Sequence, residues 1–315
     1  MRAHITNRDA LLMRVGSPLA ALLEPLRRPF GLEVVGDPYE VFAPGSIEHP
    51  FRPALRLLST TQLRSQCKRA SAVSFVTESA LQSRYPADAN AFVTSYSSIE
   101  LHDSDFVFKP RIYGEFKRPL RLVSVGSFEQ PYKGFDTLID AAAACTREGM
   151  SLELVLVGDG KYRASMEQRA SDQGLQDRVR FTGLLPSGDR VRQELDRADL
   201  FVLASKTEGL PRAMVEAMAQ ALPCLGSAVG GIPELLPAEH LFPRGNDSAL
   251  AQHIQTFLSS PALLTCASQQ NLIKAQCHHH SILDKRRRAF LEHLRRATEG
   301  WLSSITRTQE DYLFK

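Results

Sequence analysis

The 315-residue chain has few cysteines, little net charge and no long apolar run. Its five cysteines are odd in number, scattered and never in Cys-x-x-Cys spacing, which predicts reduced thiols rather than a disulfide framework or a zinc site. A net charge of +3 does not indicate a nucleic-acid partner. No stretch approaches the length of a transmembrane helix, and the N-terminus fits no secretory signal. These absences predict a cytoplasmic protein.

The common phosphate-binding motifs are also missing. Gly158-Asp-Gly-Lys-Tyr-Arg163 lacks the third glycine of the dinucleotide fingerprint, and the loop 126–134 lacks the Gly-Lys-Ser/Thr ending of a P-loop. We therefore expect neither NAD nor ATP to bind by the usual devices, which disfavours an NAD-linked oxidoreductase. The run 278–280 is three histidines, but adjacent residues on a helix point in different directions, so no metal site is predicted.

Strand and helix patterns alternate along most of the chain, in two series separated by a patternless stretch at about 102–119. The first series predicts strands at 32–35, 72–76 and 91–94 and helices at 17–28, 54–70 and 77–84. The second predicts strands at 121–125, 152–157, 179–181, 199–204 and 223–226 and helices at 135–148, 163–173 and 189–197. Such alternation predicts an α/β fold with parallel sheets. The expected parts are residues 1–108, 109–283 and a C-terminal helix and tail, 284–315.

Two glutamates eight positions apart span the start of a further predicted helix. Glu208 lies in the loop after strand 199–204, and Glu216 lies a turn and a half inside the helix. Open α/β sheets bind ligands at this end of their strands, and the first amides of a helix favour an anion such as a phosphate. The carboxylates would then accept hydrogen bonds from sugar hydroxyls on either side of a diphosphate. Glu216 also projects away from the apolar stripe of its helix, so an ordinary solvated position remains the alternative.

Two other residues are candidates for the same site, each with a structural alternative. Lys133 follows strand 121–125, and the Gly126-Ser127 pair leaves that strand end free of bulky side chains. An ammonium group beside a helix N-terminus would clamp a diphosphate. The alternative is that Lys133 is an ordinary surface lysine. Asp37 lies in the turn after strand 32–35, where it would either face a cleft or hydrogen-bond its own backbone.

Five ordered motifs resemble the donor domain of family 4 glycosyltransferases of GT-B fold. They are Val-Gly-Ser-Phe-Glu-Gln-Pro-Tyr-Lys-Gly (125–134), Val-Gly-Asp-Gly (157–160), Phe-Thr-Gly (181–183), Glu-Gly-Leu-Pro-Arg-Ala-Met-Val-Glu (208–216) and Gly-Gly-Ile-Pro-Glu (230–234). The resemblance extends more loosely to residues 33–39 and 74–78. It implies two Rossmann-like domains of GT-B type, with the C-terminal helix packed back on the first. It also implies that the N-terminal domain is incomplete, because relatives have further strand–helix units before the point that corresponds to Met1.

The resemblance implies an enzyme that transfers a hexosyl group from a nucleotide diphosphate sugar to a hydroxyl acceptor in polysaccharide biosynthesis. Such enzymes retain the configuration of the sugar and need neither a metal nor another cofactor. Glu216 would hold the ribose hydroxyls and Glu208 would act near the donor sugar, with Asp37 as a second catalytic candidate. The other expected donor-binding residues are Gly126, Ser127, Lys133, Gly158, Leu184, Gly209 and Leu210. Many relatives carry an arginine where this chain has Ser127, so Lys133 would neutralise the diphosphate alone.

The acceptor is expected in the cleft between the domains, as a saccharide or a lipid-linked saccharide. The arginines of the helix 284–296 would either touch anionic lipid at the inner membrane face or form a solvated basic face. Because the acceptor domain is expected to be incomplete, a non-catalytic nucleotide-sugar-binding or partner subunit is the alternative function.

Overall fold

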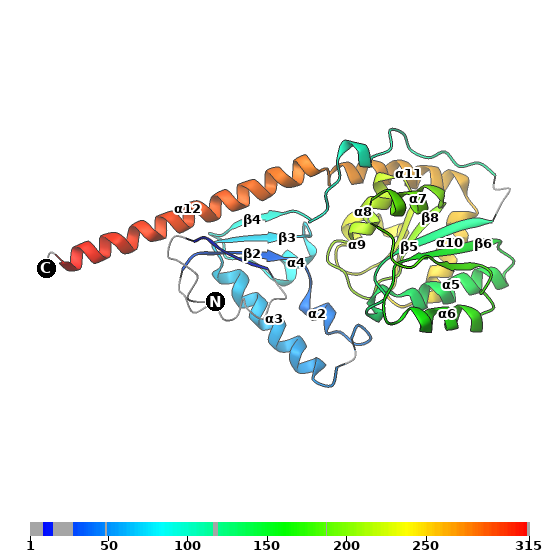
Figure 1. Ribbon diagram of the computed structural model, residues 1–315, viewed down its shortest axis with the longest axis horizontal. Helices are drawn as coiled ribbons and strands as arrows, with labels where there is room; N and C mark the ends of the chain where they lie inside the picture. Colours follow the sequence, from blue (N-terminus) through cyan, green and yellow to red (C-terminus); the bar gives the residue numbers. More distant parts are fainter. Residues whose placement is uncertain (1–8, 15–27, 48, 116–118, 187, 314–315) are drawn as a thin grey trace.

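The computed structural model describes residues 9–14, 28–47, 49–115, 119–186 and 188–313. These residues form two α/β domains, each built on a parallel sheet, with a long C-terminal helix returning along the first domain (Figure 1). The α/β class and the parallel sheets predicted from the alternation are confirmed. The predicted helix 17–28 falls almost wholly outside the described residues.

The first domain carries a four-stranded sheet in the order β1-β2-β3-β4. Its strands are β1 (Leu11–Arg14), β2 (Phe30–Val34), β3 (Ala72–Phe75) and β4 (Phe92–Ser95), and its helices are α2 (Pro38–Val41), α3 (Arg52–Arg69) and α4 (Ala80–Arg84). Three of the strands match the expected positions closely. The strand β1 was not predicted, because its four residues acquire a clear role only when they pair with β2.

The second domain carries a six-stranded sheet in the order β10-β9-β8-β5-β6-β7. Its strands are β5 (Leu120–Val125), β6 (Leu152–Val157), β7 (Val179–Phe181), β8 (Leu200–Leu203), β9 (Cys224–Ser227) and β10 (Leu241–Phe242). Its helices are α5 (Phe135–Arg147), α6 (Arg163–Asp172), α7 (Asp189–Arg197), α8 (Arg212–Ala219), α9 (Ile232–Leu235), α10 (Asp247–Leu258) and α11 (Pro261–Gln276). Each strand and helix predicted for this part of the chain is confirmed to within about two residues, the expected uncertainty of element ends.

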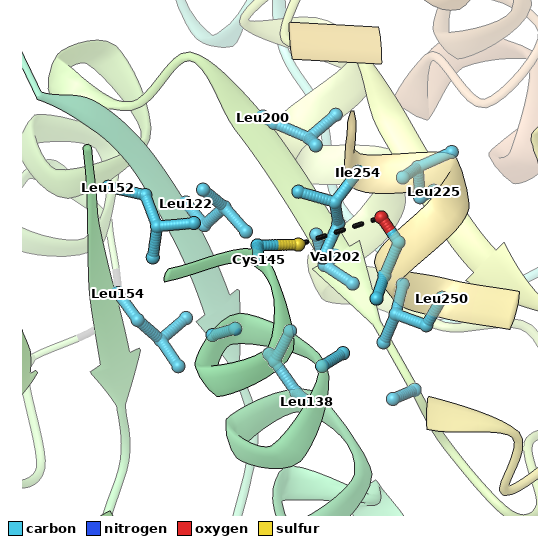
Figure 2. Packing of buried hydrophobic residues seen from close by; sticks show 14 of the residues in the cluster. Leu122, Leu138, Cys145, Leu152, Leu154, Leu200, Val202, Leu225, Leu250 and Ile254 are labelled. Atoms are coloured by element: carbon cyan, nitrogen blue, oxygen red, sulfur yellow. Dashed lines mark hydrogen bonds between the residues drawn. The ribbon is translucent and has the colours of Figure 1, made fainter. Parts of the chain in front are cut away.

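One part of the core of the second domain lies between the sheet and the helices α5 and α10, and the other part lies on the opposite face of the sheet, against α8 and α9. Figure 2 shows Leu122, Leu154 and Leu200 from the strands facing Leu138 and Ile254 from α5 and α10. Burial raises the pKa of the Cys145 thiol, at the centre of this cluster, to about 11, so the thiol is neutral at physiological pH. All five cysteines are free, and three of them are buried. Cys145 is therefore a packing residue.

The long helix α12 (His280–Leu313) joins the two domains. It packs along β2, β3 and β4, with the Phe290 ring against Tyr96 and the His293 ring stacked on Phe92 (Figure 1). The helix α3 covers the opposite face of the same sheet. Within the described residues, no helix is both long and apolar enough to cross a bilayer.

The segment expected as a linker is fastened to the second domain rather than free. Arg111 donates to the backbone carbonyls of Gln220, at 2.9 Å, and Ala198, at 2.7 Å, while its amide donates to the Ser268 hydroxyl. These contacts fix the course of the chain between the two sheets.

Candidate functional site

The order of the second sheet creates a crevice between β5 and β8. After β5 the chain crosses to β6, which lies on one side of β5, whereas β8 lies on its other side. The loops after β5 and β8 therefore begin at adjacent carboxyl ends and run in opposite directions. Open α/β sheets bind ligands at such a switch point. Gly126 follows β5 and Ser205 follows β8 closely, so the two candidate loops predicted from the sequence share this crevice.

Lys133 and Glu208 meet in this crevice. The Lys133 ammonium lies 2.5 Å from Oε1 of Glu208, and the Ser205 hydroxyl donates to the same oxygen at 2.7 Å. The two charged side chains are only 17% and 9% exposed. The stem of Lys133 passes over Gly126, where an added Cβ would lie 3.1 Å from Cγ of the lysine. Ser205 escaped the sequence analysis, although its place directly beyond β8 could have signalled it.

The loop that carries Lys133 is held against the loop after β8. The Lys206 amide donates to the Tyr132 carbonyl at 2.6 Å, and the Lys206 ammonium lies 2.7 Å from Oδ2 of Asp136. Gly134 has a φ of +68°, and a Cβ there would lie 1.9 Å from the Ala204 carbonyl oxygen. Only glycine permits this approach, which places Lys133 beside Glu208.

The start of α8 offers backbone donors beside this pair. Among the described residues, the amides of Glu208, Gly209 and Leu210 donate to no protein acceptor. The Gly-Gly-Ile-Pro-Glu loop holds this backbone in place, because the Gly231 amide donates to the Gly209 carbonyl at 2.7 Å. Free amides in the loop that leads into α8, next to an ammonium, form an arrangement that suits a diphosphate.

Glu216 lines a cavity of about 240 Å³ one turn further along α8. Burial raises the pKa of its carboxyl group, Arg212 lowers it and Asp105 raises it. No described side chain or amide donates a hydrogen bond to this carboxylate, so its oxygens can accept from a ligand in the cavity. The apolar stripe of α8 is buried, as its spacing predicted, while Glu216 is only partly exposed.

The cavity is also lined by Asp105, Arg192 and Gln220, which were not among the sequence candidates. Arg192 forms an ion pair with Asp105, and the Gln220 side chain donates to the Asp105 carbonyl at 2.6 Å. Asp105 belongs to the connection between the domains, and Arg192 lies on α7. No local motif joins these positions, so the sequence carried no signal for them.

The remaining expected donor-binding residues lie at the carboxyl ends of β5, β6 and β7. The Gly158 amide donates to the Gly183 carbonyl at 3.1 Å, and a Cβ on Gly158 would lie 1.9 Å from the Gly126 carbonyl oxygen. Ser127 is exposed, and its hydroxyl accepts from the Glu129 amide. Leu184 is 81% exposed, so its side chain is open to a partner. Their contact with a donor stays a prediction.

The Asp37 carboxylate has partners within its own domain, and a catalytic role for it stays a prediction. Its carboxylate caps α2 by accepting from the Tyr39 amide at 3.0 Å, accepts from the Tyr85 hydroxyl at 2.5 Å and pairs with Arg84. The side chain is 4% exposed. Because both oxygens are engaged and buried, the geometry favours a structural residue over one that faces a cleft.

A second cavity, of about 190 Å³, lies at the carboxyl ends of β2 and β3 in the first domain. Its polar lining includes Glu33, which accepts from the Tyr96 hydroxyl at 2.8 Å, and Arg287 from α12. Val35 and Val76 also line this cavity, and both lie against Gly209. A Cβ added to Gly209 would lie 2.6 Å from the Val35 carbonyl oxygen. The cavity therefore adjoins the Glu208–Gly209 corner of the crevice.

The described residues contain no group of three or more histidine, cysteine, aspartate or glutamate side chains placed to hold a metal ion. The His280 ring contacts the rings of His279 and His102 in tilted arrangements, and His279 lies 3.2 Å from Asp103.

The second domain is similar to known proteins. Residues 119–260 match the family model described as Glycosyl transferases group 1. Protein CapJ of Staphylococcus aureus is 28% identical over 245 residues, which cover 76% of this chain and 60% of CapJ. The amylovoran biosynthesis glycosyltransferase AmsK of Erwinia amylovora is 34% identical over 155 residues, which cover 46% of this chain and 37% of AmsK. The matched regions thus span less than two thirds of either relative.

A solved structure supports the fold. The crystal structure of Anabaena HepE in complex with UDP and glucose superposes with a TM-score of 0.69 at 20% identity, covering 89% of this chain and 77% of that one. Residues 119–260 are therefore similar to the group 1 glycosyltransferase family, and the two parallel-sheet domains form a GT-B-like fold.

Proposed function

We propose that this chain transfers a hexosyl group from a nucleotide diphosphate sugar to a hydroxyl acceptor, with retention of configuration and without a metal. The observation that carries the proposal is the meeting of Lys133 and Glu208 at the start of α8, with Glu216 lining a cavity further along the same helix. The amylovoran biosynthesis role in the name of AmsK favours polysaccharide assembly as the setting.

Each part of the donor has a matching group on the protein. The diphosphate would accept from the Lys133 ammonium and from the amides of Gly209 and Leu210. The ribose hydroxyls would donate to Glu216, whose carboxylate is not engaged by the protein. The donor sugar would then lie next to Glu208. In this arrangement the base extends toward the carboxyl ends of β6 and β7, where Gly158 and Leu184 lie.

The Lys133–Glu208 ion pair gives the donor a specific way to enter. An incoming diphosphate competes with Glu208 for the ammonium, and the displaced carboxylate becomes free to accept from a sugar hydroxyl. The bond between the anomeric carbon and the diphosphate oxygen then breaks, and the acceptor oxygen bonds to that carbon on the same face. The nucleoside diphosphate leaves, and the acceptor proton passes to it or to solvent. Lys133 and the helix amides stabilise the charge that develops on the leaving group.

The acceptor would approach from the first domain. The cavity beside Gly209 is lined by Glu33, Tyr96 and Arg287, which offer a carboxylate, a hydroxyl and a guanidinium to a polar saccharide. Because Val35 and Val76 join this cavity to the Gly209 corner, a saccharide bound there could present one hydroxyl to the donor sugar near Glu208.

Calorimetry and a donor assay test the proposal together. We expect UDP or GDP to bind, and Glu216→Gln to weaken nucleoside diphosphate binding while pyrophosphate binding is retained. Glu239→Gln, an exposed charge change in the same domain, serves as the control. Radiolabelled UDP-glucose and GDP-mannose should yield free or transferred sugar. A folded protein that binds neither nucleotide contradicts the proposal, and binding without turnover across many acceptors would identify a non-catalytic subunit.

A further inference from the structure

A groove between α2 and α3 combines positive charge with an apolar lining (Figure 1). Its volume is about 420 Å³, within the range of sites that hold small ligands. Its three arginines are Arg52, Arg56 and Arg64, and Phe42 and Leu57 are among the apolar side chains that line it. Ligand sites commonly combine an apolar lining with a few polar groups that fix the ligand. The groove therefore has the form of a binding site, and none of the donor-binding candidates lines it.

The protein does not neutralise the positive charge of this groove. Within the part of the chain that the structure describes, none of the three arginines forms an ion pair with a carboxylate. Glu40, on α2, is already engaged, because it pairs with Arg84 and with Arg244, each at 3.2 Å. The helix α3 contains no aspartate or glutamate of its own. An anionic ligand is thus the partner whose charge complements the groove.

The spacing of the arginines indicates an extended ligand. Arg52 and Arg64 are 12 residues apart on α3, which corresponds to a rise of about 18 Å along the helix axis. Arg56 lies between them, one turn after Arg52. A single phosphate or carboxylate is too small to contact both ends of this row. The ligand that uses all three arginines therefore carries several anionic groups along a chain.

Among extended polyanions, an acidic oligosaccharide suits the lining of the groove best. One face of a sugar ring carries C–H groups that pack on a side chain such as Leu57, while its hydroxyls reach a polar neighbour such as Thr61. Nucleic acids stack their bases on open aromatic rings, but the Tyr39 ring is already in contact with Arg56, at 3.6 Å, and Arg84, at 4.5 Å. An acidic peptide must immobilise a flexible side chain for each contact, whereas a sugar ring holds its carboxylate rigidly.

We propose that the groove between α2 and α3 binds an acidic oligosaccharide whose carboxylates pair with Arg52, Arg56 and Arg64. A guanidinium group donates two parallel hydrogen bonds to a carboxylate, which fixes the orientation of each sugar unit. The Arg56 side chain is already held in place, because its Nε donates to the Tyr39 carbonyl at 2.8 Å and its guanidinium lies over the Tyr39 ring.

The groove lies close to the crevice between the domains. The Val35 carbonyl lies against Gly209, and Tyr39, which lines the groove, follows Val35 by four residues. Four residues span at most about 14 Å. The Arg244 side chain, from the second domain, donates to the Pro44 carbonyl at 2.9 Å, beside the same groove. An oligosaccharide bound there would extend toward the donor sugar, which makes the groove a remote acceptor subsite; this role rests on the proposed function, whereas the binding itself does not.

Calorimetry with defined oligosaccharides, in the absence of any sugar donor, tests the proposal. We expect the full chain to bind hexagalacturonate but not maltohexaose, which is neutral and has the same number of sugar units. Arg52→Gln/Arg64→Gln should weaken hexagalacturonate binding roughly 100-fold, about tenfold for each charged hydrogen-bonded contact. Leu57→Ser should weaken it roughly threefold or more without changing the charge. Both variants leave the contact between Arg56 and Tyr39 in place.

The control removes the same charge from a different basic surface. Arg295 and Arg296 lie on α12, are exposed and pair with Glu299 and Glu292 on the same helix. The helix α12 packs on the opposite face of the first sheet from α3. Arg295→Gln/Arg296→Gln should therefore bind hexagalacturonate within about twofold of the wild-type chain, as expected for charges remote from the contact. Circular dichroism verifies that every variant is folded.

The other outcomes contradict the proposal. A folded chain that binds UDP or GDP but not hexagalacturonate overturns it and leaves the proposed function standing. Equal binding of the two oligosaccharides also overturns it, because the charge of the ligand would then have no effect. Tighter binding of oligothymidylate or of hexaglutamate assigns the groove to a nucleic acid or to an acidic peptide. Unchanged hexagalacturonate binding in the α3 variants places the saccharide site elsewhere on the chain.

Discussion

Glu234 in the second domain accepts a 2.7 Å hydrogen bond from the backbone amide of Ala80 in the first domain. The same carboxylate accepts from the amides of Glu78, at 2.5 Å, and Ser79, at 2.9 Å, and from the Ser79 hydroxyl. One side chain of the Gly-Gly-Ile-Pro-Glu motif thus caps the start of α4 from across the domain boundary. A charged acceptor at a helix start stabilises both the helix and, here, the contact between the domains.

We expect Glu234→Gln to loosen this contact. The variant keeps one acceptor oxygen but loses the negative charge, which should weaken the contact by about 1–2 kcal/mol. The radius of gyration measured by small-angle X-ray scattering should increase, while far-UV circular dichroism stays unchanged. Glu239→Gln provides the charge-matched control in the same domain. An unchanged radius of gyration in the Glu234 variant would show that the other contacts suffice to hold the domains together.

Lys133→Met should weaken binding of UDP and of pyrophosphate alike, by roughly 10- to 100-fold, because a charged hydrogen bond to phosphate is lost. The methionine retains the apolar stem that packs over Gly126. Calorimetry with both ligands provides the measurement, and Lys161→Met, at an exposed position in the same domain, is the control. Unaltered pyrophosphate affinity in the Lys133 variant would refute the diphosphate role of this lysine.

Glu216→Gln should stabilise the unliganded protein at pH 7 even though it weakens nucleotide binding. Burial raises the pKa of this carboxyl group above its ordinary value of 4.5, so the folded state binds more protons than the unfolded state in the interval above 4.5. The free energy of unfolding of the wild-type chain therefore falls as the pH rises through that interval, and the amide variant lacks this contribution. Urea denaturation of both proteins between pH 4.5 and pH 7 measures the difference, which should widen with increasing pH. A variant less stable than the wild type at pH 7 would contradict this expectation.

Acid should destabilise the protein through His278. Burial lowers the pKa of this imidazole to about 4, assisted by Lys274 and Arg286 and opposed by Glu78 and Glu234. The pKa of His278 in the folded state lies below its ordinary value of 6.5, so the stability that the neutral imidazole contributes is fully present above pH 6.5. As the pH falls to about 4, this contribution is lost, which lowers the free energy of unfolding by up to about 3 kcal/mol. Urea denaturation at several pH values should show that the free energy of unfolding of His278→Gln depends less on pH than that of the wild-type chain. Parallel curves for both proteins would exclude this histidine as a source of the pH dependence.

Gly134→Ala should destabilise the protein far more than Gly174→Ala. Both glycines have left-handed backbones, with φ of +68° and +72°, but only a Cβ on Gly134 would meet the Ala204 carbonyl, whereas nothing lies within 4 Å of the corresponding position at Gly174. We expect Gly174→Ala to lower the free energy of unfolding by about 1–2 kcal/mol, from the backbone conformation alone, and Gly134→Ala to lower it by more. Thermal unfolding compares the two variants, and UDP binding should fall only in the Gly134 variant. Equal losses of stability would show that the Ala204 contact relaxes at no cost.

The sequence by itself determined the elements of the second domain and the identity of its main donor-binding candidates. The strand 152–157 and the helix 189–197 were predicted at their observed ends, because a largely buried strand and an amphipathic helix each leave a pattern in consecutive residues. Lys133, Glu208 and Glu216 were found because each lies at a fixed distance from a predicted strand or helix end.

Only the tertiary structure decided how residues distant in the chain meet. It brought Lys133 to Glu208 across 75 positions, since β5 and β8 are neighbours in the sheet. It also brought the Asp37 carboxylate into contact with Arg84 and Tyr85. The Arg192–Asp105 pair beside Glu216 likewise joins α7 to the connection between the domains. Local patterns record how a segment buries its own face, whereas these pairings depend on sheet order and packing between segments, which leave no fixed spacing in the sequence.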